Sequence, residues 1–105
     1  MANYLLAFHG GGMPETDAER ARVMQAWTDW MGELGDAVVD PGNPIGQAMM
    51  IGADGSVSAG GGANPVSGYM IIKAEGLDDA VKLATGCPVR ESGGSVEVAE
   101  TFPVM

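Results

Sequence analysis

Apolar residues in this chain gather in short runs and in one helical stripe. The run from position 4 to position 9 is too short for a helix and is followed by three glycines, so it predicts a strand. Its two faces would carry Tyr4, Leu6 and Phe8 on one side and Leu5 and Ala7 on the other. A strand that is apolar on both faces is buried on both sides, so we expect it at the centre of a sheet.

The helical stripe follows this strand. Thr16 and Glu19 have the spacing of a capping box, and Gly35 supplies a stop signal. Between them, apolar residues recur at helical spacing at Val23, Met24, Trp27, Met31 and Leu34. The pattern predicts a helix over residues 17–34 with one broad apolar face.

The rest of the chain predicts five more strands and a second helix. Strands are expected at 36–40, at 47–51 and 56–58 around a hairpin turn at 53–55, and at 69–74. A two-turn helix is expected at 77–84, and the last strand at 95–99. This β-α-β-β-α-β order with an extra hairpin predicts a ferredoxin-like α+β sandwich with an antiparallel sheet, as a single domain over residues 1–105.

Both predicted helices would cover the same face of that sheet. Since the first strand and the strand at 69–74 are apolar on both faces, the other face also needs a cover. A second copy of the chain would provide it, so we expect a homodimer that associates face to face.

Charge and cysteine content narrow the possible partners and location. The chain has 14 acidic and 5 basic residues, a formal charge of −9, and its bases form no patch. Nucleic acids and anionic membrane surfaces are therefore not expected as partners. One cysteine excludes an intrachain disulfide, and no signal peptide or membrane span is evident, so we expect a cytoplasmic protein.

His9 is the main candidate for acid–base chemistry because it is the chain's one histidine. It ends the first predicted strand, where we expect the mouth of a cleft between sheet and helix. Asp40, at the end of the next strand, is the predicted carboxylate partner, and Asp36 competes with it if the two strands are antiparallel. The alternative is a structural histidine bonded to a backbone carbonyl or to solvent.

Four residues are candidates for contact with a small ligand between helix and sheet. They are Trp27, Tyr69, Met24 and Met31. Their alternative role is simply core or dimer interface. Cys87, which precedes a proline, is expected to be a buried turn residue, and the scattered His, Cys and Asp positions predict neither a metal site nor a cofactor.

Several short segments together carry a resemblance to a known family. They are Tyr4-Leu5-Leu6, the Trp-bearing first helix, Gly68-Tyr69, Leu77-Asp78-Asp79-Ala80-Val81, Cys87-Pro88 and Gly93-Gly94-Ser95-Val96-Glu97-Val98. In this order the chain resembles the YCII-related (YciI-like) family, and most closely its DGPF branch. The resemblance implies a ferredoxin-like protomer in a dimeric α+β barrel. Most members of that family have no assigned reaction.

The chain departs from the family at two places. The Asp-Gly-Pro-Phe segment is replaced by a glycine-rich loop at 59–65, and the first helix has no histidine. Met24 and Glu33 stand near the positions of the family's proposed catalytic pair, so that pair is not carried over. We therefore expect a small dimeric protein that binds an apolar or aromatic ligand between helices and sheet. The alternative is a cofactor-free isomerase, lyase or monooxygenase with His9 as general acid/base, and the sequence leaves open whether the protein is an enzyme.

Overall fold

A computed structural model describes residues 1–12, 14–60, 62 and 64–103 of the chain. The elements are β1 (Ala2–His9), α1 (Asp17–Leu34), β2 (Val38–Asp40), β3 (Met49–Ile51), β4 (Val57–Ala59), β5 (Val66–Ala74), α2 (Leu77–Ala84) and β6 (Ser95–Glu100). Two short 3-10 turns, Gly35–Ala37 and Pro88–Arg90, complete the described structure. The predicted α+β class is confirmed.

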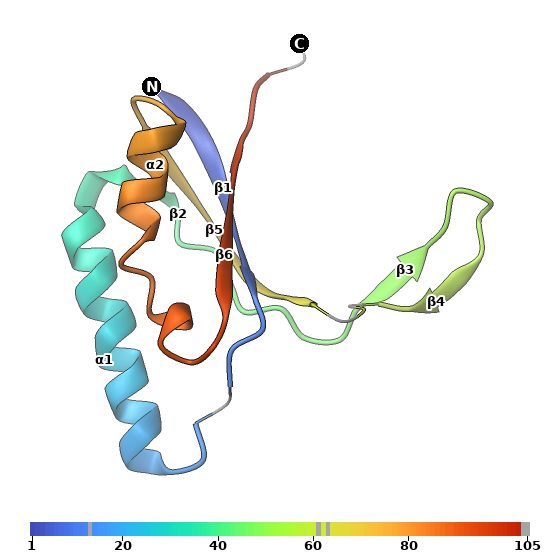
Figure 1. The fold of residues 1–105 in the computed structure, drawn as a ribbon, viewed down its shortest axis with the longest axis horizontal. Coiled ribbons are helices and arrows are strands. Elements are labelled where there is room, and N and C mark those ends of the chain that lie inside the picture. Colours follow the sequence, from blue (N-terminus) through green and yellow to red (C-terminus); the bar gives the residue numbers. More distant parts are fainter. Residues whose placement is uncertain (13, 61, 63, 104–105) are drawn as a thin grey trace.

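The main sheet has four strands in the order β2-β5-β1-β6, and every neighbouring pair is antiparallel. β1 thus lies between two strands, which confirms its predicted central position. Both α-helices lie on one side of this sheet, and the β3–β4 hairpin projects from the other side (Figure 1). The hairpin forms a separate two-stranded sheet.

The first helix has the boundaries that its capping residues predict. The Thr16 hydroxyl oxygen accepts a hydrogen bond from the Glu19 backbone N–H at 3.1 Å, which satisfies one of the free donors of the first turn. The Glu19 carboxylate accepts from the Glu15 N–H and not from that of Thr16, so the capping box is incomplete. Gly35, at φ 54°, ends the helix and donates its N–H to the Met31 carbonyl.

Alternation along the strands divides the sheet into a covered and an uncovered face. The covered face and the two helices form the core, which consists of Tyr4, Leu6, Phe8, Trp30, Leu34, Met70, Ile72, Ala74, Ala80, Ala84, Cys87 and Val89. The opposite face, here called the open face, carries Leu5, Ala7, His9, Tyr69, Ile71, Lys73, Ser95, Glu97 and Ala99. Its apolar side chains are only half-buried in the single chain.

Several predicted boundaries shift. The strand predicted at 36–40 is shorter because residues 35–37 form a 3-10 turn before β2. The hairpin strands are β3 and β4 at 49–51 and 57–59, displaced from the predicted 47–51 and 56–58. β5 begins three residues earlier than predicted, at Val66. Positions 61 and 63 of the predicted glycine-rich loop lie outside the described residues.

Three aromatic rings hold α1 on the sheet. Phe8, Trp27 and Trp30 pack edge to face, with ring centroids 5.2 to 6.4 Å apart. Trp30 is 4% exposed, and its indole N–H donates to the Leu83 carbonyl of α2 at 3.1 Å. This one side chain therefore joins β1, α1 and α2.

We expect Trp30→Ala to lower the free energy of unfolding by about 3–5 kcal/mol, because it leaves a large cavity and an unpaired carbonyl. Urea denaturation followed by circular dichroism measures the loss. The control is Met24→Ala on the same helix, which we expect to cost less than about 1 kcal/mol since Met24 is 66% exposed. An equal loss in both variants would contradict the role given to Trp30.

Candidate functional site

A cavity of about 540 Å³ lies between α1, the end of β1 and the loop after β2. Its lining residues are Phe8, Gly10, Gly11, Gly12, Pro14, Arg20, Val23, Met24, Trp27, Met31, Pro41, Gly42, Asn43, Pro44, Ser67, Gly68, Tyr69, Val89 and Ser92. A volume of this size suits a small organic ligand. A second cavity of about 350 Å³ lies between α2 and β6 and contains none of the predicted site residues.

The structure brings the four predicted ligand residues to the larger cavity, but not in the same way. Met24, Trp27 and Met31 lie on successive turns of α1 and form one apolar wall. Tyr69 lines the cavity from β5, next to the loop after β2, where its backbone N–H donates to the Asn43 carbonyl. In the strand register Tyr69 is opposite Ala7, so its side chain shares the open face.

Glycines allow the loops of the cavity to approach the sheet closely. Gly42 has φ 70°, and a Cβ atom there would overlap the Tyr69 carbonyl. In the other loop, the Gly10 N–H donates to the Pro65 carbonyl and the Gly12 N–H to the Ser92 carbonyl. These contacts fix the backbone positions of both loops that line the cavity.

Arg20 is the one charged residue among the described residues that line this cavity. Its guanidinium donates to the Asp17 carboxylate at 3.1 Å, one turn earlier on α1. Both side chains are well exposed, so this ion pair contributes little to stability and can be exchanged for another carboxylate. The chain as a whole carries a charge of −9, whereas the one charged side chain in the described lining of this cavity is basic.

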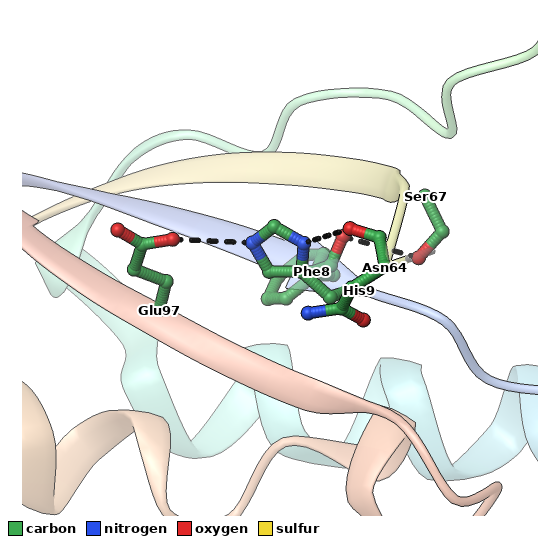
Figure 2. A network of polar contacts seen from close by, with 5 residues as sticks. All are labelled: Phe8, His9, Asn64, Ser67 and Glu97. Atoms are coloured by element: carbon green, nitrogen blue, oxygen red, sulfur yellow. Dashed lines mark hydrogen bonds and ion pairs between the residues drawn. The ribbon is translucent and has the colours of Figure 1, made fainter. Parts of the chain in front are cut away.

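His9 has two acceptors as neighbours, and both are visible in Figure 2. Its Nε2 lies 3.2 Å from a carboxylate oxygen of Glu97, and its Nδ1 lies 3.0 Å from the Asn64 carbonyl oxygen. Neither neighbour can donate a proton to the ring, so a neutral imidazole makes one of these bonds and an imidazolium makes both. The His9 side chain is 14% exposed, whereas that of Glu97 is 68% exposed.

The carboxylate that contacts His9 is not the predicted one. Asp40 lies on β2, which β5 separates from β1, and its carboxylate accepts instead from the Gly42 N–H at 2.8 Å. Asp36 lies in the 3-10 turn before β2. Glu97 comes within reach because β6 pairs directly with β1, with Ala7 opposite Glu97 and His9 opposite Ser95.

His9 and the cavity lie on opposite faces of the sheet. Phe8 lines the cavity, and the next residue along a strand points the other way. The expectation that His9 would stand at a cleft mouth between sheet and helix is therefore wrong. Its Glu97 neighbour could have been anticipated only from the β1–β6 pairing, because the two residues are 88 positions apart.

Cys87 is buried, as predicted, at the turn after α2. Burial raises the pKa of its thiol to about 11, because a thiolate would lose its hydration there. Within the described ranges, no three His, Cys, Asp or Glu side chains come together as a possible metal site. Cys87 therefore belongs to the core and not to a reactive centre.

We expect Cys87 in the folded protein to react at pH 8 with a disulfide reagent such as 5,5′-dithiobis(2-nitrobenzoate) at least about 100-fold more slowly than in the unfolded chain, since both burial and a raised pKa reduce accessible thiolate. The release of the coloured thiolate measures the rate, with and without guanidinium. Equal rates in the two states would show that the thiol is accessible in the fold.

Comparison of the sequence with models of known protein families and with curated proteins gives no match. In the described part of the chain, neither helix is both long and apolar enough to cross a membrane.

Proposed function

We propose that the protein binds a small apolar or aromatic molecule in the cavity between α1 and the sheet. The observation that carries this proposal is the cavity itself, about 540 Å³ in volume and walled on one side by Met24, Trp27 and Met31. Aromatic and thioether side chains are well suited to a flat hydrophobic ligand, which can stack on the indole or contact the sulfur atoms.

We also infer that the ligand ends in a carboxylate or a similar anion. Arg20 lies at the cavity, no acidic residue is among the lining residues of the described chain, and its present partner Asp17 is solvated. An arginine fork matches a carboxylate in geometry, and in a chain with a charge of −9 this arginine is the positive group that an acidic ligand would meet at the cavity.

The protomer we propose is ferredoxin-like and belongs with the YCII-related proteins that the sequence resembles. The strand order β2-β5-β1-β6, with antiparallel neighbours and both helices on one face, supports this architecture. The half-buried apolar residues of the open face, among them Leu5, Ile71 and Ala99, support a homodimer.

Cofactor-free acid–base catalysis is the second candidate function. The observation that favours it is the contact between His9 and Glu97, since a carboxylate can orient an imidazole and stabilise its charged form. A substrate of such an enzyme would have to approach the open face, away from the apolar cavity. We rank this function below ligand binding because the two features do not meet in one site.

The first test places a carboxylate on the wall of the cavity. Met24→Glu should weaken binding of 2-naphthamide at least about tenfold, because the ligand would have to desolvate the new charge. Ala21→Glu is the matched control, since residue 21 is exposed on the same helix and is not a lining residue. Isothermal titration calorimetry gives both affinities, and if the wild-type protein binds neither naphthamide nor naphthoate, the proposed cavity function fails.

The second test concerns the charge of the ligand. Arg20→Gln should weaken binding of 2-naphthoate about threefold to tenfold and leave 2-naphthamide unchanged, as expected for a partly exposed ion pair. Arg22→Gln, with the same loss of charge outside the cavity, should change neither affinity. Equal effects of the two arginine variants would mean that net charge, and not Arg20, decides the preference.

A further inference from the structure

The β3–β4 hairpin presents large apolar side chains to solvent. Met49, Met50, Ile51 and Val57 are 56–71% exposed. In the strand register Met49 is opposite Ala59 and Ile51 is opposite Val57. These two pairs share one face of the hairpin, whereas Met50 lies on the other face, opposite Ser58. A continuous apolar face of this kind is a mark of an interaction site when it is found on the surface of a small domain.

The hairpin has a well-formed turn but no packing partner in the described chain. The Asp54 carboxylate accepts from the Ser56 N–H at 3.0 Å and from its hydroxyl at 2.7 Å, contacts that hold the pKa of Asp54 below its usual value. Gly55, at φ 87°, takes the position that needs a left-handed backbone. Isolated two-stranded hairpins are only marginally stable, so these turn contacts set its shape while its apolar face still lacks a cover.

The hairpin extends away from the body of the protein (Figure 1). The radius of gyration is 15.1 Å, compared with roughly 13 Å for a compact chain of this length. The hairpin projects on the side opposite the helices, which is the side of the open face. It therefore stands on the side of the open face, whose apolar residues are only half-buried in the single chain.

Charge distribution indicates what covers the hairpin. Residues 41–72 contain one charged residue, Asp54, although the chain as a whole has 14 acids and 5 bases. Two copies that each carry a charge of −9 repel one another, and they approach most easily through a segment that carries few charges. Depletion of charged residues is also typical of the centre of a protein interface.

We propose that the β3–β4 hairpin is a dimerisation arm, which packs its Met49–Ile51–Val57–Ala59 face against the open face of a second copy. The occupant is a second copy because one chain supplies both halves of the contact: a projecting apolar arm, and an uncovered sheet face with half-buried apolar residues such as Leu5 and Ile71. A twofold axis lets both arms be buried reciprocally, as in any isologous dimer. This proposal rests on the homodimer inferred above and assigns to the hairpin the residues that hold it together.

The experiment compares two neighbouring residues of β4 that lie on opposite hairpin faces. Val57→Asp places a charge on the arm's apolar face, and Ser58→Asp places the same charge on the other face, opposite Met50. Both positions are exposed in the single chain, so neither change should unfold it, and circular dichroism checks this. Sedimentation velocity over a range of concentrations gives the dimer dissociation constant of each protein.

We expect the wild type to sediment as a dimer of twice 10.7 kDa at 50 µM, and Val57→Asp to raise the dissociation constant at least about tenfold. Ser58→Asp should stay within about twofold of the wild type. If neither variant changes a stable dimer, or both weaken it equally, the arm assignment is wrong while the dimer itself stands. A monomeric wild type would overturn the arm and the inferred homodimer together, but not ligand binding in the cavity.

Discussion

The alternation of side chains along β1 is the constraint on which the other features depend. Tyr4, Leu6 and Phe8 are buried under the helices, whereas Leu5, Ala7 and His9 lie on the open face. Because β1 is central, this division fixes the two faces of its neighbours β5 and β6 through their register. A shift of one residue would exchange the faces and expose the core. The same division separates the cavity, which Phe8 lines, from the contact between His9 and Glu97.

Local signals in the sequence predicted the helices and the class of fold. The cap at Thr16 and the stop at Gly35 fixed α1, and α2 has the predicted range 77–84. The partner of His9 could not be predicted in this way, since it depends on which strand adjoins β1. We predicted Asp40 because β2 is the next strand in the sequence. In the sheet, however, β1 lies between β5 and β6, and among the described strands β2 pairs only with β5. Pairing between distant segments is decided by the packing of the whole sheet.

The residues proposed for ligand contact could likewise be predicted from the sequence only in part. Met24, Trp27 and Met31 could be grouped from the sequence because their spacing belongs to one helix. The other wall consists of two loops, and their positions depend on close backbone approaches such as that of Gly42 to Tyr69. Arg20 also escaped notice, since a basic residue on an exposed helix turn is ordinarily just solvated. We propose a role for Arg20 because the other described residues that line the cavity are uncharged, and this grouping exists only in the folded chain.

The hairpin turn at 53–55 was readable from the sequence, but its projection from the body was not. A turn such as Asp54-Gly55 specifies how two strands meet, and it carries no information on what lies against their faces. The scarcity of charge over residues 41–72, which contain only Asp54, does carry such information, because the surface of a solvated arm in a chain of charge −9 would be expected to carry more of the acidic residues. Segments that are exposed, apolar and free of charge are costly for a monomer. Their presence here is physically reasonable if the folded unit of this protein is the pair and not the single chain.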